Sequence, residues 1–403
     1  MAHFDDLETQ DPTLREQRLF DALPVQVRHA QRHAPAFAEI LARIDPDSVT
    51  SREALARLPV TRKSELLELQ KARRPLGGFM AGRLGDMVRL YQSPGPLYEP
   101  EGRRPDYWRF ARALYGAGFR AGELIHNTFS YHFTPAGFMV EGGAAVLGCP
   151  VFPAGVGQTE QQVQAIADLK PAGYVGTPSF LKIIVEKAAE TGVDISSLTK
   201  ALASGEALPS SLRSWFAERG IEVYQCYATA DLGLIAYESE AREGLIVDEG
   251  VLVEIVRPGS AKPVADGEVG EVVVTTFNPD YPLIRFGTGD LSAILPGVSS
   301  CGRTNHRIKG WMGRADQTTK VKGMFVHPGQ VNEVARRHPQ LQRVRLVVEQ
   351  QDHNDIMTLH CETAQGDKSL QQTIAATLRE VTKLRGQVAF VPPGSLPNDG
   401  KVI

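Results

Sequence analysis

The chain has 403 residues, a formal net charge of −3 and a hydrophobic share of 42%. This length exceeds what one ordinary core organises, so we expect two domains, and the balanced charge gives no reason to expect a nucleic-acid or membrane-surface partner. No apolar run is long enough to span a bilayer. The cysteines, at positions 149, 226, 301 and 361, lack any paired spacing. Reduced thiols and an acidic start without a signal pattern predict a cytoplasmic protein.

Residues 1–86 are predicted to form a helical lead-in that packs on the main domain. Apolar side chains recur there at near-helical spacing, with charged residues between them. A further helix is expected with Thr61 as its cap and with Ser64 and Glu65 in its first turn. The apolar residues of the first helical segment are Leu14, Leu19, Phe20, Leu23 and Val27.

Strand and helix patterns alternate between residues 125 and 227. Short apolar runs that end in loops are separated by amphipathic segments of helical length. This alternation predicts parallel βαβ units, in which ligands bind beyond the carboxyl ends of the strands. An aromatic, amphipathic helix is also predicted over 105–118. The expected strands begin near residues 125, 150, 172, 200 and 221, and the expected helices span 137–148, 159–169, 180–191 and 209–219.

The last part of the chain has a different pattern. Residues 343–349 and 356–362 alternate as strands, 369–384 form an amphipathic helix, and 388–391 form a last strand. The predicted fold class is therefore α/β. A large, multi-layer N-terminal domain with mainly parallel sheets is expected over 1–313, and a small, mobile α+β C-terminal domain over 314–403.

The sequence around Asp290 is the most informative for chemistry. An apolar run at 271–277 is followed by Leu283-Ile284-Arg285-Phe286-Gly287-Thr288-Gly289-Asp290. The two glycines let the backbone pass close to a ligand, and the carboxylate can accept two hydrogen bonds from a vicinal diol. Three further motifs follow, namely Gly313-Arg314-Ala315-Asp316, Lys320-Val321-Lys322-Gly323 and Leu396-Pro397-Asn398-Asp399-Gly400-Lys401.

This order of motifs resembles the adenylate-forming superfamily, which contains the acyl- and aryl-CoA ligases. Three more matches resemble its phenylacetate-CoA ligase type, and the likeness runs from about Leu55 to Lys401. They are Leu58-Pro59-Val60-Thr61-Arg62-Lys63, Gly176-Thr177-Pro178-Ser179 and Ser204-Gly205-Glu206.

The resemblance implies an ATP-dependent acid–thiol ligase. Such an enzyme adenylates a carboxylic acid, here expected to be an aryl or arylalkyl acid similar to phenylacetate, and transfers it to coenzyme A with release of AMP and pyrophosphate. ATP, Mg²⁺ and coenzyme A as co-substrate are implied, and the family type suggests a homodimer. Transfer to a carrier-protein thiol and the identity of the acid stay open.

The resemblance also implies roles for single residues. Lys401 is the expected catalytic lysine, and Asp316 or Gln317 marks the expected hinge between domains. Thr229 is expected to touch phosphate and Asp231 to carry Mg²⁺, where Asp231 stands in place of the family's Glu. The expected nucleotide-binding residues are Ser204, Gly205 and Glu206 beside the adenine, Tyr227, Asp290 at the ribose, and Arg314 near the ribose or phosphate.

The expected phosphate loop departs from the family pattern. Ser93 and Gly95 remain, but the threonine pair and the lysine are absent, prolines stand at 94, 96 and 100, and Glu99 adds like charge. One interpretation is a rigid loop with Arg103 or Arg104 as the cation. The other is a poor grip on pyrophosphate. This second interpretation supports an alternative function, a catalytically reduced or inactive homologue that binds a nucleotide or acyl-CoA.

Two further groups are candidates for binding. Tyr131, His132 and Phe133 follow a predicted strand and are expected to line the acid pocket, or else to be packed aromatics at a strand end. Cys301 and His306 form a Cys-x4-His pair. Tetrahedral zinc would need further thiolate ligands, so whether these two residues bind a metal stays open.

Overall fold

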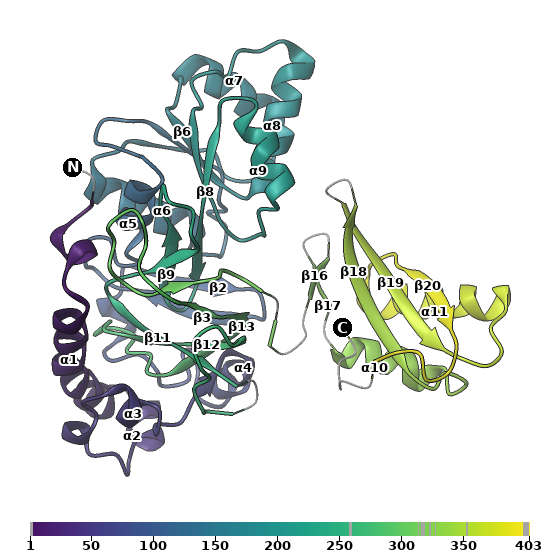
Figure 1. The fold of residues 1–403 in the computed structure, drawn as a ribbon, viewed down its shortest axis with the longest axis horizontal. Helices are drawn as coiled ribbons and strands as arrows, with labels where there is room; N and C mark the ends of the chain where they lie inside the picture. The colour runs from purple at the N-terminus through teal and green to yellow at the C-terminus, as the bar shows by residue number, and fades with distance from the viewer. Residues whose placement is uncertain are drawn as a thin grey trace. The chain divides into compact units, whose positions relative to one another are not determined.

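The computed structural model describes residues 3–257, 260–312, 314–315, 319–321, 324–326, 328–351, 354–397 and 403. They fold into two compact units, Met1–Thr288 with Ser292–Trp311 and Gly289–Leu291 with Met312–Ile403 (Figure 1). The predicted α/β class is confirmed. Among the described residues, no helix has the length and apolar character needed to cross a membrane.

The first part of the larger unit is mostly helical. Helix α1 begins after Asp11, whose carboxylate accepts the backbone N–H groups of Thr13 and Leu14, and the predicted stripe is buried except for Leu14. Thr61 is not a helix cap, because it lies in a strand and Arg62 precedes the helix instead. The elements are η1 (Asp6–Thr9), α1 (Pro12–His33), α2 (Pro35–Ile40), η2 (Pro46–Ser48), α3 (Arg52–Leu55), β1 (Thr61–Arg62), α4 (Lys63–Ala72) and η3 (Leu84–Asp86).

A nine-stranded sheet occupies the centre of the larger unit, in the order β14-β15-β10-β9-β8-β7-β6-β4-β5. The five strands from β8 to β5 are parallel, as the βαβ pattern predicted. The parallel strands are β4 (Ile125–Asn127), β5 (Val151–Pro153), β6 (Gly173–Gly176), β7 (Lys200–Ala203) and β8 (Glu222–Thr229). The antiparallel extension is β9 (Gly233–Glu238), β10 (Leu245–Val247), β14 (Ile294–Leu295) and β15 (Arg307–Ile308).

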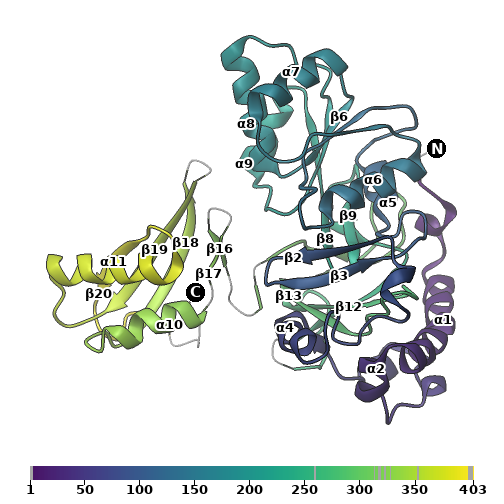
Figure 2. The same cartoon turned by 180° about the vertical axis from the view of Figure 1, so that it is seen from behind.

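Helices cover both faces of this sheet. Tyr174 packs in the core formed with α7, α8 and α9, whereas its neighbour Val175 packs in the core formed with α5 and α6. Figure 1 and Figure 2 show the two helical layers on opposite sides of β6 and β8. This alternation is why these strands are apolar throughout. The helices are α5 (Phe110–Gly116), α6 (Ala136–Leu147), α7 (Thr159–Leu169), α8 (Pro178–Thr191) and α9 (Ser210–Ala217).

Helix α5 is shorter than the helix predicted over 105–118. The carboxylate of Asp106 accepts the N–H groups of Phe110 at 2.7 Å and Ala111 at 2.9 Å. Asp106 and Arg109 both have positive φ, at 44° and 62°. These left-handed residues delay the first helical turn, so the aromatic residues before Phe110 lie in a loop.

A second sheet has the order β1-β13-β12-β11, and β2 and β3 form a separate antiparallel hairpin. The buried apolar side chains of α1 pack in one hydrophobic core with residues of β11, β12 and β13. The strands are β2 (Arg89–Ser93), β3 (Leu97–Glu101), β11 (Val251–Val256), β12 (Gly270–Thr276) and β13 (Phe286–Ser292).

The smaller unit contains the predicted strands and helix of the C-terminal part. Its core includes Leu346, Leu359, Ile374 and Leu378. Strand β19 pairs antiparallel with β18 and parallel with β20. The elements are β16 (Thr319–Val321), β17 (Met324–Val326), α10 (Pro328–Arg337), β18 (Val344–Gln351), β19 (Asn354–Glu362), α11 (Lys368–Thr382) and β20 (Gln387–Val391).

Candidate active site

The loops after β4, β7 and β8, which carry several predicted site residues, meet at the carboxyl edge of the parallel strands. Thr128 donates its N–H to Val175 O at 2.8 Å, and Ser204 donates its N–H to Gly176 O at 3.1 Å. The hydroxyl of Ser204 reaches the carbonyl of Cys226 at 2.9 Å. Residues separated by about a hundred positions in sequence therefore lie side by side, where open α/β sheets bind ligands.

The Ser204-Gly205-Glu206 segment follows β7 directly. Ser204 is buried and fixed by the two bonds above, whereas Gly205 and Glu206 are exposed. Gly205 has φ +79°, a conformation that favours glycine. A carboxylate oxygen of Glu206 accepts the N–H of Ser179 at 3.4 Å, so the segment is joined to the start of α8.

The turn between β8 and β9 holds the predicted phosphate and metal residues. Tyr227 is half-buried on β8, opposite Ala236. The hydroxyl of Thr229 accepts the N–H of Leu232 at 3.1 Å, which shapes the turn. Asp231 lies within this turn, and its side chain is shielded from solvent.

Lys63 completes a charged cluster around Asp231. Its ammonium lies 2.5 Å from Oδ2 of Asp231. Burial, and then the charge of Asp231, raise the pKa of Glu99 to about 8, while Lys63 opposes that rise. Sequence reasoning treated Lys63 only as part of a family motif. Lys63 is the last residue of that motif and the first residue of α4, and this position was the available sign of a role.

The oxygen atoms around Asp231 are suitable ligands for a magnesium ion. Oδ1 of Asp231 is buried, and no hydrogen-bond partner for it exists among the described residues. Glu99 places a second carboxyl group close enough for the charge of Asp231 to raise its pKa. Carboxylate oxygens, together with substrate phosphates and water, are the usual ligands of Mg²⁺. The residues present therefore fit the ion that the resemblance implies.

The segment expected to be a phosphate loop is the β2–β3 hairpin. Ser93 ends β2 and pairs with Leu97, and Gly95 occupies the exposed turn with φ +138°. The carboxyl group of Glu99 accepts both the hydroxyl and the N–H of Ser93, the latter at 3.2 Å. The two donors of Ser93 are thus occupied by a side chain of the same hairpin.

Arg104, one of the two arginines suggested as a replacement cation, has other partners. Arg104 donates to Oδ1 of Asn278 at 2.7 Å and lies 3.5 Å from a carboxylate oxygen of Asp280. The cation that lies at the Glu99 and Asp231 cluster is Lys63. Lys63 reaches this cluster through the tertiary structure, because α4 begins beside the hairpin although it lies thirty residues before Ser93 in the chain.

The three aromatic candidates for the acid pocket are placed differently. The Tyr131 ring packs edge-on against Phe138, with centroids 5.1 Å apart, and its hydroxyl accepts from Nδ2 of Asn127 at 2.8 Å. His132 is exposed, and Phe133 is 73% exposed. The carbonyl of Phe133 accepts the N–H of Gln92 at 2.8 Å, which joins this loop to the β2–β3 hairpin.

Asp290 and Arg314 are brought together within the smaller unit. Nη1 of Arg314 lies 3.0 Å from Oδ1 of Asp290, and the two residues form an antiparallel bridge. This pair holds the carboxylate predicted to bind ribose. Lys401, Asp316 and Gln317 lie outside the described residues.

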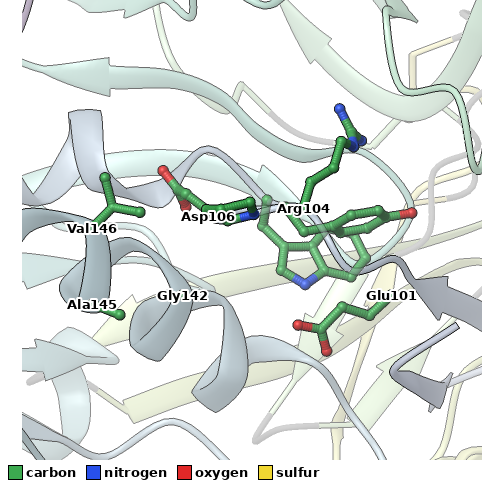
Figure 3. Close-up of a pocket in the computed structure, with 9 residues that line it drawn as sticks. Glu101, Arg104, Asp106, Gly142, Ala145 and Val146 are labelled. Carbon is green, nitrogen blue, oxygen red and sulfur yellow. The ribbon is translucent and has the colours of Figure 1, made fainter.

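A cavity of about 350 Å³ lies elsewhere in the larger unit. Figure 3 shows Glu101, at the end of β3, with Arg104 and Asp106 from the chain that follows, facing Gly142, Ala145 and Val146 of α6. Of the candidate residues from the sequence, its lining contains Arg104, the suggested replacement cation, and none of the expected catalytic, nucleotide-binding or acid-pocket residues.

The Cys301 and His306 pair gains no further metal ligand. The described residues contain no group of three or more His, Cys, Asp or Glu side chains that could hold a metal ion. Cys301 Sγ instead lies 3.1 Å from the hydroxyl of Ser299 and 3.5 Å from Nη1 of Arg303.

Two family models match this chain in order. The AMP-binding enzyme model matches residues 109–278, and the AMP-binding enzyme C-terminal domain model matches residues 323–402. The chain belongs to the adenylate-forming enzymes, of the phenylacetate-CoA ligase type. The resemblance stated from the motifs is confirmed.

Curated relatives agree with this placement, and a solved structure shares the fold. The phenylacetate-coenzyme A ligase of Thermus thermophilus is 28% identical over 92% of this chain and 91% of its own length. That of Aromatoleum evansii is 29% identical over 85% and 80%. A crystal structure of 2-hydroxyisobutyryl-CoA ligase shares the fold, with a TM-score of 0.79, 24% identity, and coverage of 99% of this chain and 90% of that one.

The chain is therefore an AMP-forming ligase that uses ATP to join an acid to coenzyme A. Small-molecule substrates are its partners. The alternative of a catalytically reduced binding protein is not favoured by these relatives.

Proposed function

We propose that the ligase activates an aryl or arylalkyl acid similar to phenylacetate and transfers it to coenzyme A. The single observation that carries this proposal is the meeting of the motif-bearing loops at one sheet edge, in an enzyme of the phenylacetate-CoA ligase type. The loop after β4 adds aromatic side chains beside that edge, and Tyr131 is the one of its three candidates that is packed in place. An aromatic ring next to the site favours an aromatic acid.

The proposed roles of the nucleotide-binding residues are those that the resemblance to the family implies. The segment that contains Ser204, Gly205 and Glu206 lines the adenine, with Tyr227 beside it. Asp290 accepts hydrogen bonds from the ribose hydroxyls, and Arg314 holds that carboxylate in place through their 3.0 Å pair. Such fixed acceptors orient the nucleotide before the reaction begins.

The adenylation step joins two negatively charged reactants. A carboxylate oxygen of the acid attacks the α-phosphorus of ATP, the acyl–O–P bond forms, and pyrophosphate leaves with the bonding electron pair. Lys401 is proposed to neutralise charge at this step, and Thr229 is proposed to contact phosphate. A magnesium ion bound through Asp231 supplies positive charge that offsets the repulsion between the reactants. The thiol of coenzyme A then displaces AMP from the acyl carbon.

The test is acid-dependent release of AMP with formation of the CoA thioester. The panel contains phenylacetate, benzoate and a straight-chain aliphatic acid. We expect the aryl acids to give the highest kcat/KM, and we expect Asp290→Ala to lower it by about 100-fold or more. Asp266→Ala, an exposed aspartate of the larger unit, is the control and should retain activity.

The role of Lys401 is tested by separating the half-reactions. Lys401→Ala should lose acid-dependent pyrophosphate exchange yet still form thioester from a supplied acyl-adenylate, because the lysine is assigned to adenylation only. Lys368→Ala, on the exposed start of α11, is the matched control. Intact exchange in Lys401→Ala would remove this residue from the mechanism.

We also propose that the protein forms a homodimer and lies in the cytoplasm. The homodimer implied by the family type is tested by light scattering of the purified protein. The cytoplasm is the proposed location, since ATP and coenzyme A are available there and the cysteines at 149, 226, 301 and 361 are free thiols.

A further inference from the structure

Glu99 is a buried carboxyl group at the turn expected to grip phosphate. Its residue exposure is 0% and that of Ser93 is 6%. One carboxyl oxygen accepts the N–H of Ser93 at 3.2 Å, and the other accepts the Ser93 hydroxyl. Both oxygens of Glu99 are therefore engaged by one residue, Ser93, which ends the first strand of the same hairpin.

The two hydrogen-bond donors of Ser93, its backbone N–H and its hydroxyl, lie next to an exposed turn. Pro94, Gly95 and Pro96 form the turn that follows Ser93, and all three are exposed. A backbone N–H and a hydroxyl at the edge of an exposed turn are groups that bind phosphate oxygens. In this protein an internal carboxyl group holds them instead.

Glu99 also lies beside a second carboxyl group. Asp231 is close enough to raise the pKa of Glu99, and Lys63 is paired with Asp231 at 2.5 Å. The contact with Ser93 therefore lies directly next to the charged pair of Lys63 and Asp231.

We propose that Glu99 is a specificity-determining residue that competes with the β- and γ-phosphates of ATP for the donors of Ser93. It thereby lowers the affinity for ATP and for pyrophosphate and leaves the affinity for AMP unchanged, since AMP lacks those groups. This inference rests on the proposed function, because it assumes that the nucleotide lies with its phosphates at the hairpin turn.

The experiment is isothermal titration calorimetry of the full chain with ATP, inorganic pyrophosphate and AMP, each with and without Mg²⁺. Glu99→Gln should bind ATP and pyrophosphate on the order of tenfold more tightly than the wild type, which is about 1.4 kcal/mol. AMP should bind equally to both. Glu101→Gln is the matched control, because Glu101 lies two residues along β3 and accepts from Tyr91 instead of Ser93.

A double-mutant cycle isolates the contact with Ser93. The gain from Glu99→Gln should shrink when Ser93→Ala is already present, since the contested hydroxyl is gone. Thermal unfolding checks that each variant is folded, and Glu99→Met replaces Glu99→Gln if the latter unfolds.

The outcomes separate this inference from the proposed function. Equal or weaker binding of pyrophosphate by Glu99→Gln would overturn the inference, and weaker binding only with Mg²⁺ would instead make Glu99 a metal ligand. If AMP binds to neither protein, the proposed function is wrong, while the pyrophosphate titration still decides the inference by itself.

Discussion

The ammonium of Lys63 lies 2.5 Å from Oδ2 of Asp231, whose side chain is completely shielded from solvent. The pair joins the first residue of α4 to the turn between β8 and β9. Because one partner is buried, breaking the pair leaves a carboxylate without its counter-charge. This relationship makes the larger unit's stability and its proposed site depend on the same contact.

Lys63→Ala should therefore destabilise the protein. We expect a loss of about 2 kcal/mol in the free energy of unfolding, below the range for fully buried pairs because Lys63 retains some exposure. Urea unfolding followed by circular dichroism measures it. Lys71→Ala is the control on the same helix, since Lys71 pairs with Glu68 on the surface and should cost less than about 0.5 kcal/mol. Similar losses in both variants would contradict the prediction.

Arg285→Lys should be more damaging than a conservative exchange suggests. Arg285 has 0% exposure, and its guanidinium makes a two-pronged ion pair with Glu254 at 2.9 and 3.0 Å. It also donates to the carbonyl groups of Ala56, Leu58 and Ala261. A lysine cannot reproduce this planar set of donors, so we expect a loss of about 3 kcal/mol in stability.

The measurement for Arg285→Lys is the midpoint of thermal unfolding together with AMP affinity. Arg257→Lys, at an exposed position of the same unit, serves as the control. A folded Arg285→Lys variant that loses only AMP binding would show that Arg285 acts in the site and not in the framework.

Gly176→Ala should displace the loop after β6. A methyl group there would stand 2.0 Å from Oγ1 of Thr128 and 2.4 Å from the hydroxyl of Tyr174, far inside contact distance. Those two side chains are themselves hydrogen-bonded at 2.7 Å. We expect a loss of about 1–3 kcal/mol in stability and weaker AMP binding, because Gly176 O accepts the Ser204 N–H.

Gly85→Ala is the matched control for Gly176→Ala. An added methyl group at position 85 meets nothing within 4 Å. Denaturant unfolding and calorimetry with AMP should show no more than a small change. An unchanged AMP affinity in Gly176→Ala would mean that the loop position is not needed for the nucleotide.

Glu99 should make stability fall as pH rises. Burial raises its pKa from 4.5 to about 8, so between these values the folded state binds a proton that the unfolded state has lost. The stabilising contribution of the protonated group is fully present below pH 4.5 and is lost as pH rises through about 8. Glu99→Gln removes this dependence, and the wild type should lose at least about 1 kcal/mol more than the variant between pH 5 and 8.5.

Urea unfolding at pH 5, 6.5 and 8.5 tests this expectation. Glu160→Gln, on an exposed position of α7, should follow the wild type across the series. Parallel stability curves for the wild type and Glu99→Gln would show that the carboxyl group does not change its protonation in this range.

Much of the architecture was readable from the sequence because it depends on local periodicity. The alternation of strands and helices between residues 125 and 227 required a parallel sheet, and the structure has one. Helix boundaries were less secure. The predicted helix over 105–118 starts only at Phe110, because Asp106 and Arg109 adopt left-handed backbone conformations that no periodic pattern encodes.

The site was only partly readable for a related reason. Ordered motifs placed Ser204, Asp231 and Asp290, and the geometry of the sheet edge brings the loop of Ser204 to its neighbours. The roles of these residues stay predictions. Lys63 was not recognised as a site residue, since its partner is 168 positions away in sequence.

The sequence by itself determined the family, the layered α/β class and the loops that carry chemistry, because each depends on residue types at short, fixed spacings. Only the tertiary structure decided the state of the β2–β3 hairpin. In the sequence Glu99 adds like charge to the expected phosphate loop, whereas in the structure it is buried against Ser93 and beside Asp231. Burial and charge pairing depend on which residues the fold brings close together in space. The spacing of residue types along the sequence does not specify these distances.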